Sequence, residues 1–281
     1  MIHANHPVGP SMSYSLNSEV TSRGIGIVQG SVASNFRKLA SGKSINAAAD
    51  NAAGLAIAEQ LEAELRADRQ ASRNGNDGIS MIQVAEGATA EVTNMLGRMR
   101  ELTVAASSDT LSQDQRDSLS KEYTQLRQEI DRISETTKFN GRSLFQDQDL
   151  AVQVGANGSS ENRVDLSFQA LSADSLGVDN IDFSSADSAR AGLSSIETAL
   201  NNTNGMRAGF GAAQNRFESA IRNLATSDEN NSAALSRIQD ADFAEVTANL
   251  TRDQILLQAS TSVFAQSNAN RDVAWRLLQQ R

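Results

Sequence analysis

The sequence predicts a mainly α fold: a long antiparallel helical bundle or coiled coil with a small β-hairpin patch. Apolar and small residues recur at alternating steps of three and four over long stretches, the spacing that keeps one stripe of a helix against a partner helix. The two prolines are Pro7 and Pro10, so no proline interrupts a helix after position 10. Aromatic residues are only 4 % of the 281 residues, which limits the apolar area that one helix pair can bury.

Charge and composition exclude several classes of function. A net charge of −9 and a pI near 4.8 argue against a nucleic-acid surface, which needs a clustered basic face. The chain contains no cysteine, so it forms no disulfide, thiolate metal site or cysteine nucleophile. The first residues lack a basic region followed by an apolar run, and no window reaches 18 apolar residues. We therefore expect neither a cleaved secretory signal peptide nor a membrane span.

The segment 1–43 has apolar residues at roughly helical spacing, interrupted by Gly24, Gly26 and Gly30. Each glycine weakens a helix by about 1 kcal/mol relative to alanine. We expect this segment to be frayed or disordered alone, and helical when it is packed. Ser41-Gly42 is a plausible helix end.

The organising helix is predicted from residue 46 to about 106. Its seam has period 3.5 with a small slip after Ile82, and the seam residues are Ala58, Leu61, Leu65, Ser72, Gly75, Ile79, Ile82, Val92, Leu96 and Met99. Many of them are small, so one helix pair would bury too little area to be stable alone. Further helices, and further chains, are needed.

A second helix is predicted after the polar turn at 107–110. Ser112 and Gln115 have the spacing of a capping box, and Leu119, Tyr123, Leu126, Ile130 and Ile133 follow at steps of four and three. The connection is short, so this helix should pack antiparallel on the first one.

The apolar period changes to two after the turn signal Asn140-Gly141. Alternating runs at 150–154 and 164–168 lie on either side of Asn157-Gly158. They predict a β-hairpin with a longer loop.

Helical spacing resumes at Ala186, and its grid keeps its phase across 201–205, which predicts one continuous helix. The last forty residues form a further amphipathic helix, whose natural partner is the N-terminal segment. The predicted divisions are therefore 1–43, 44–185, 186–241 and 242–281.

At this point the residues resemble a known family. The blocks SVASNFRKLASGKSINAAADNAAGLAIAEQL, ASRNGNDGISMIQVAEGATAEV, RMRELTVAAS and SRIQDADFAEVTANLTRDQILLQASTSVFAQSN are similar to bacterial flagellin, in the family's order and spacing. The resemblance covers roughly 32–145 and 186–270. Residues 1–43, with Pro7, Pro10 and the glycines at 24, 26 and 30, and the C-terminal AWRLLQQR depart from the family pattern.

The resemblance implies a rod (D1) made by 44–185 and 186–241, and an inner coiled coil (D0) that the two chain ends, 1–43 and 242–281, form on assembly. About fifteen residues near 172–186 stand where the family carries variable outer domains, so the chain resembles a minimal flagellin. The residues expected to drive inner-core assembly are Leu16, Val20, Val28, Val32, Phe36, Leu39, Phe243, Val246, Leu250, Leu257, Phe264, Leu277 and Leu278.

The implied function is that of a structural subunit of the extracellular flagellar filament, exported by the flagellar type III apparatus. The implied partners are copies of the chain itself, an export chaperone, and the hook-junction and cap proteins. Flagellin recognition by the host Toll-like receptor carries over to Arg98, Leu102 and Glu122, although these residues could equally serve only to pack subunits together.

No enzyme, cofactor or metal site is expected. The two histidines, His3 and His6, both lie in the N-terminal leader, and no H-E-x-x-H motif is present. Two alternatives to the filament subunit remain: a hook–filament junction protein, and a flagellin-type surface adhesin or glycan-binding protein. A glycan-binding module should carry an aromatic-rich insertion, whereas the single tryptophan, Trp275, lies in the last helix.

Overall fold

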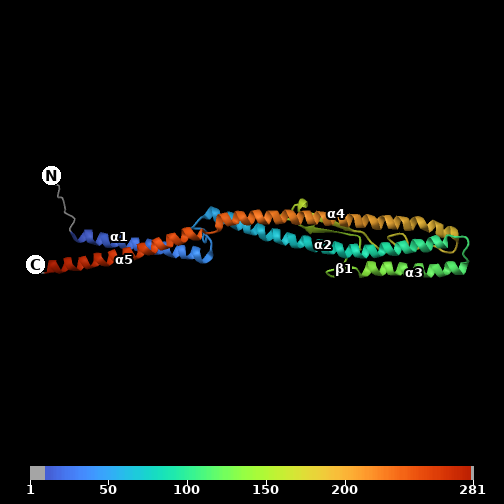
Figure 1. Cartoon of the computed structure of the whole chain (residues 1–281), viewed down its shortest axis with the longest axis horizontal. Coiled ribbons are helices and arrows are strands. Elements are labelled where there is room, and N and C mark those ends of the chain that lie inside the picture. The colour runs from blue at the N-terminus through green and yellow to red at the C-terminus, as the bar shows by residue number, and fades with distance from the viewer. Residues whose placement is uncertain (1–9, 280–281) are drawn as a thin grey trace, which may run out of the picture. The chain divides into compact units, whose positions relative to one another are not determined.

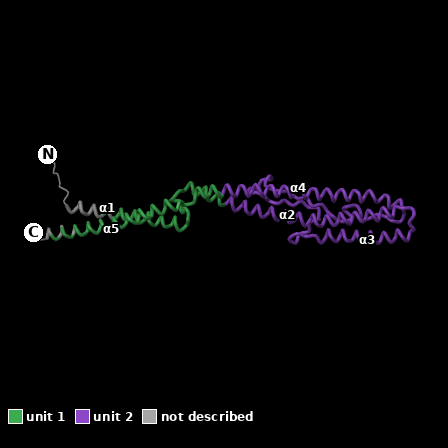
Figure 2. Tube along the Cα trace, in the orientation of Figure 1, with its two compact units in different colours: residues 1–62, 232–281 green, residues 63–231 purple. Residues whose placement is uncertain are grey.

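The computed structural model divides into two compact units, which Figure 2 distinguishes by colour. It describes residues 10–279, except the side chains of 10–18, 21, 271, 274, 275 and 277–279. Unit 1 comprises Met1–Glu62 and Ser232–Arg281, and unit 2 comprises Ala63–Asn231. Long helices dominate both units and two small antiparallel sheets accompany them. The predicted fold class is confirmed.

Unit 1 contains α1 (Pro10–Ser41) and α5 (Phe243–Gln279), which pack against each other, as Figure 1 shows. The meeting of the two terminal segments is as predicted. Helix α1 ends at Ser41 and Gly42 follows at φ +70°, the left-handed conformation that ends helices. The predicted helix end at Ser41-Gly42 is therefore confirmed, and the glycine-interrupted segment is helical where it packs on α5.

The predicted start of the organising helix at residue 46 is wrong, because α2 spans Ala52–Ala106. The carboxylate of Asp50 accepts the backbone N–H groups of Asn46 and Ala47, each over 3.0 Å, and holds these residues in a turn. Oδ1 of Asn51 then accepts the N–H of Gly54 over 2.9 Å, the hydrogen bond of an N-cap residue. Short polar side chains that bond their own backbone delay the helix.

In unit 2 the seam of α2 runs without the slip predicted after Ile82. Its buried residues continue in steps of three and four through Ala85 and Thr89 to Val92. Thr89 is fully buried because its hydroxyl donates to the carbonyl of Ala85 over 2.7 Å. A threonine whose hydroxyl is hydrogen-bonded thus occupies a position that the sequence pattern left out of the seam.

Unit 2 also contains α3 (Gln113–Thr136) and most of α4 (Ala186–Gln239). Helix α4 is continuous through 201–205, as predicted, and Thr203 within that stretch is buried with its hydroxyl bonded to the carbonyl of Ala199. At Gly78 of α2 an added Cβ would lie 2.7 Å from the ring of Phe217 of α4. Glycine at this position therefore permits the close approach of the two helices.

The capping box at the start of α3 is present as predicted. The N–H of Gln115 donates to Oγ of Ser112 over 3.4 Å, and the N–H of Ser112 donates to Oε1 of Gln115 over 2.9 Å. These bonds satisfy backbone donors that the first helical turn leaves unpaired.

We expect the substitution Ser112→Ala to destabilise unit 2 by about 0.5–2 kcal/mol, the usual cost of a lost N-cap side chain. Urea unfolding of the monomer, followed by circular dichroism, measures the change. Ser118→Ala, an exposed serine in the interior of the same helix, is the control and should change stability little. An equal loss in both variants would contradict the capping argument.

The predicted β-hairpin is formed by β3 (Gln148–Gln153) and β4 (Arg163–Phe168). The strands are antiparallel, with Leu150 opposite Leu166 and Val152 opposite Val164. Their connection contains the short 3-10 helix η1 (Ser160–Asn162). A second, smaller hairpin of β1 (Lys138–Phe139) and β2 (Arg142–Ser143) turns through Asn140-Gly141, where both residues have positive φ.

The connector between β4 and α4 contributes to the core of unit 2. The sequence indicates only that about fifteen residues, near 172–186, stand in the place of the family's outer domains. Its apolar residues Leu171, Ala173, Leu176, Val178 and Phe183 are buried. The hydroxyl of Tyr123 in α3 donates to the carbonyl of Val178 over 2.8 Å, and burial raises the pKa of Tyr123. The connector is thus a packed part of the unit.

Candidate assembly surfaces

The α1–α5 pair of unit 1 has a seam with the period of a coiled coil. The two helices run antiparallel, since the N–H of Ala241, before α5, donates to the carbonyl of Gly42, after α1, over 2.9 Å. Seam residues are at least half-buried and recur at steps of three and four. They are Ile25, Val28, Val32, Asn35 and Leu39 on α1, and Val246, Leu250, Asp253, Leu257, Ser260, Phe264 and Ser267 on α5.

The same two helices also expose large apolar side chains away from the seam. Ile27 on α1 is 72 % exposed, and Ile255 and Val263 on α5 are 62 % and 61 % exposed. Helices that are apolar on several faces are typical of helices surrounded by other helices. We define the outer apolar surface as Val20, Ile27, Phe36, Phe243, Ile255, Leu256, Val263 and Val273.

The thirteen residues predicted to drive assembly divide between these two surfaces. Val20, Phe36 and Phe243 belong to the outer apolar surface. Seven line the seam, namely Val28, Val32, Leu39, Val246, Leu250, Leu257 and Phe264. The side chains of Leu16, Leu277 and Leu278 lie outside the described residues.

Sequence reasoning missed Ile27, Ile255, Leu256 and Val263 of the outer apolar surface. It followed a single stripe on each helix, and these residues lie off that stripe. The signal that could have found them is the presence of apolar residues between the stripe positions of α1 and α5. Such residues are unfavourable on a solvated helix face and point to further partners.

Burial of the outer apolar surface would be a substantial driving force. Each large aliphatic or aromatic side chain contributes about 1.5–3 kcal/mol when it leaves water. Rigid-body association costs about 4–15 kcal/mol, so the burial of several of these side chains is needed to offset it. A contact with more than one neighbouring molecule would provide that burial.

A clasp joins the end of α1 to the start of α5, and we define it as residues 42–45 with 239–241. The N–H of Ser44 donates to the carbonyl of Gln239 over 2.6 Å, and Lys43 and Asp240 form an isolated antiparallel bridge. Ile45 is 6 % exposed and packs against Gly54, where a Cβ would lie 2.8 Å from Cδ1 of Ile45. The clasp therefore keeps the segment between α1 and α2 within unit 1.

The turn beside the clasp should respond to acid through Asp50. The hydrogen bonds from the backbone N–H groups of Asn46 and Ala47 hold the pKa of this carboxyl below its usual value. A depressed folded-state pKa gives stability that is present above the unfolded pKa of about 3.9 and is lost as pH falls through the folded pKa.

We therefore expect the difference in melting temperature between the parent protein and Asp50→Ala to be constant at neutral pH and to shrink as the pH falls below the unfolded pKa of about 3.9. Thermal melts followed by circular dichroism measure this difference. The control is Glu59→Ala, which removes an exposed carboxylate of the same unit. A difference that persists undiminished at the lowest pH would contradict a role for the Asp50 charge.

In unit 2, Arg98, Leu102 and Glu122 lie together but differ in exposure. Nε of Arg98 on α2 donates to Oε1 of Glu122 on α3 over 2.8 Å, and Nη1 donates to Oε2 of Glu101 over 2.8 Å. These bonds, to Glu101 first and to Glu122 second, raise the pKa of Arg98. Leu102 is 3 % exposed and belongs to the core. Within the unit, the charged pair is thus accessible and the leucine is buried.

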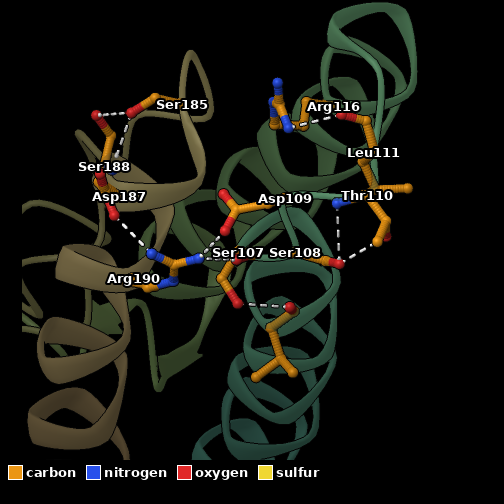
Figure 3. Close-up of polar contacts among 11 residues, drawn as sticks. Ser107, Ser108, Asp109, Thr110, Leu111, Arg116, Ser185, Asp187, Ser188 and Arg190 are labelled. Atoms are coloured by element: carbon orange, nitrogen blue, oxygen red, sulfur yellow. Dashed lines mark hydrogen bonds and ion pairs between the residues drawn. The ribbon is translucent and has the colours of Figure 1, made fainter.

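Figure 3 shows Arg190 of α4 between the end of α2 and the first turn of α4. Its Nη2 donates to the carbonyl of Ser107 over 3.0 Å and to Oδ2 of Asp109 over 2.9 Å, while Nη1 donates to Oδ1 of Asp187 over 2.6 Å. A cation at the last carbonyls of a helix compensates their unpaired charge. These contacts fix the ends of α2 and α4 relative to each other.

In the part of the chain that the structure describes, no three or more His, Asp or Glu side chains are grouped to hold a metal ion. Both histidines lie in 1–9, outside the described residues. None of the helices that the structure describes carries an apolar stretch long enough to cross a membrane.

Comparisons with known proteins agree with a helical polymer subunit. Residues 12–150 match the model of the bacterial flagellin N-terminal helical region, and residues 193–278 match that of the C-terminal helical region. A flagellin of Halalkalibacterium halodurans is 42 % identical over 91 % of this chain and 94 % of its own length. A flagellar filament 30.7 kDa core protein of Treponema maltophilum is 34 % identical over 92 % of this chain and 95 % of its own.

Among solved structures, a putative flagellar hook-associated protein from Vibrio parahaemolyticus superposes with a TM-score of 0.57. It covers 68 % of this chain and 100 % of its own, at 15 % identity. At that identity the likeness concerns the fold alone.

Proposed function

Because the chain belongs to the bacterial flagellin family and is a structural subunit of the extracellular flagellar filament, we propose that α1 and α5 drive polymerisation by packing their outer apolar surface against copies of themselves. The observation that carries this proposal is the concentration of exposed apolar residues on these two helices. From family membership, the partners in this packing are other copies of the same chain.

The polymer would grow by contacts between different patches of successive subunits. Such contacts, related by a rotation that does not close, generate an open helical assembly. A single α1–α5 pair buries limited apolar area against an ordering cost of about 1–2 kcal/mol per residue. The ordering of the terminal helices would therefore be coupled to their burial among neighbours.

The domain organisation of the filament follows the same proposal. Residues 1–43 and 242–281 would form the inner core, and 44–185 with 186–241 would form the surrounding rod. The division is supported by the breaks in helix at 42–51 and 240–242. The compact units divide at other positions, within α2 and α4, because the clasp groups the nearby turns of these helices with α1 and α5.

The remaining partners are proposed from family membership. They are the type III export apparatus, an export chaperone, and the hook-junction and cap proteins at the ends of the polymer. Flagellin is a family of structural proteins, and nothing in the described residues suggests a catalytic role.

We also propose that Arg98 and Glu122 contribute to a surface that packs subunits and that a host Toll-like receptor could contact in the monomer. The exposure of the pair supports this role, whereas buried Leu102 would only support the surface from beneath. Arg98→Ala should weaken binding of the monomer to the receptor ectodomain at least tenfold, measured by biolayer interferometry.

The control for this measurement is Arg132→Ala, since Arg132 is also an exposed arginine, paired with Glu129 on α3. If the Arg98 variant and the parent bind the receptor with equal affinity, Arg98 does not contribute to the receptor-binding surface.

Electron microscopy of purified full-length protein tests the main proposal. The protein is depolymerised by heat and reassembled with salt. Smooth filaments without outer projections are expected, since 169–185 is packed into unit 2. Persistent monomers would overturn the proposal and favour a junction protein or a glycan-binding surface protein, which ligand binding would then distinguish.

A further inference from the structure

Asn35 and Asp253 place an amide and a carboxylate in the seam between α1 and α5. Nδ2 of Asn35 donates to Oδ2 of Asp253 over 2.9 Å, and the bond is partly buried. Both residues fall on the steps of three and four that define the seam. Their seam neighbours are aliphatic: Val32 and Leu39 on α1, and Leu250 and Leu257 on α5.

An aliphatic seam by itself specifies its alignment weakly, because apolar burial has no direction and a heptad repeat looks the same after seven residues. In α1 and α5 the alignment is weakly specified on more than one face, because both helices also carry the outer apolar surface. A shift of one heptad moves one helix by about 10 Å along the other.

The polar pair distinguishes the observed alignment from the shifted ones. A shift of one heptad in one direction places Asp253 opposite Val28, where the carboxylate loses its amide donor. The shift in the other direction places Asn35 opposite Ser260 and moves Asp253 beyond Ser41, the last residue of α1. A partly buried polar group without its partner is unfavourable, so the first shift is penalised. The second shift loses the bond to the carboxylate and leaves the Asn35 amide facing only a serine hydroxyl.

We propose that the Asn35–Asp253 hydrogen bond sets the register of the α1–α5 pair. A single polar contact in an apolar coiled coil is known to specify register at some cost in stability. The inference rests on the proposed function, because the register decides which residues of α1 lie beside which residues of α5 on the outer apolar surface. A subunit with a shifted pair would present a different surface to its neighbours.

The alternative explanation is that the clasp alone sets the register. The hydrogen bonds of Ser44 with Gln239 and of Ala241 with Gly42 already tie the two helices near their junction. The two explanations differ in what happens when the polar pair is replaced by leucine and the clasp is left intact.

Cross-linking maps the register, because the chain has no cysteine of its own. Seven residues from Asn35 and from Asp253 lie Val28 and Ser260, so a Val28→Cys/Ser260→Cys pair reports the observed register. A Val28→Cys/Ser267→Cys pair reports a shift of one heptad. Both pairs are introduced into the full-length protein, with and without Asn35→Leu/Asp253→Leu, and treated with a short bismaleimide.

We expect the leucine pair to reduce the yield of the Val28–Ser260 cross-link at least threefold, even if the protein melts at a higher temperature. The exchanged pair Asn35→Asp/Asp253→Asn keeps one donor and one acceptor, and should restore the parental yield. An unchanged yield with the leucine pair would overturn the inference and assign the register to the clasp. Failure of the exchanged pair to restore the yield would also count against the hydrogen bond.

Filament formation is scored separately by electron microscopy, so the two proposals can fail independently. A parent that cross-links in register but never polymerises would refute the proposed function alone. A parent that polymerises while the leucine pair keeps its register would refute the register inference alone.

Discussion

Replacement of Ile255 and Val263 by aspartate is expected to abolish polymerisation and to leave the monomer folded. Both side chains are about three-fifths exposed on α5 in the single chain, so the substitutions remove little intramolecular packing. In a polymer that covers these two positions, each substitution removes about 1.5–3 kcal/mol of stabilisation by apolar burial. Each new carboxylate would in addition have to be desolvated without a partner.

The loss amounts to at least about 3 kcal/mol per subunit, or more than a hundredfold in the equilibrium constant for subunit addition. Sedimentation of protein reassembled over a range of concentrations measures the critical concentration, which should rise by that factor. The matched variant Ile255→Val/Val263→Ile keeps apolar side chains of similar volume and should polymerise like the parent. Polymerisation of the aspartate variant at the parental concentration would show that this surface remains outside the subunit contacts.

Phe217→Ala is expected to destabilise unit 2 by about 3–5 kcal/mol, the range for deletion of a buried aromatic ring. Phe217 is fully buried in the core of the unit. Its ring lies where a Cβ on Gly78 would approach to 2.7 Å, so the ring fills the space between α2 and α4. Because a glycine stands opposite, the α2 position facing the ring has no side chain of its own to fill the cavity.

Urea unfolding of the monomer measures this loss, and Phe36→Ala is the control, since Phe36 is 53 % exposed on α1 of unit 1. A second test uses the partner position. Gly78→Ala alone should cost about 1–3 kcal/mol by overpacking, and Phe217→Leu in the same chain should recover part of that cost. Additive losses in the double variant would contradict direct contact between the two positions.

The helices were predictable because each follows from local chemistry. The heptads of α3, its capping box at Ser112 and the constant phase of α4 are all written in residues a few positions apart. The same holds for the β3–β4 hairpin, where the period of two is visible within each strand. The family, and with it the filament, was identified from contiguous blocks of the same helices.

The differences between the predicted and the observed α2 have local and tertiary causes. The Asx-type contacts of Asp50 and Asn51 shift the start of α2, and they compete with helix over a few residues where spacing alone is ambiguous. Thr89 continues the seam through a hydrogen bond to its own helix, which a reading of apolar residues passes over.

In the candidate assembly surface, too, some features follow from the sequence and others only from the tertiary structure. The sequence by itself determined which segments are long amphipathic helices, that the two ends belong together, and that the chain is a flagellin. Only the tertiary structure decided which apolar residues of those ends are used within the chain and which remain exposed, as Val246 and Ile255 illustrate on one helix. The physical reason is that periodicity reveals a helix face, whereas burial depends on the partner that the folded chain places against that face.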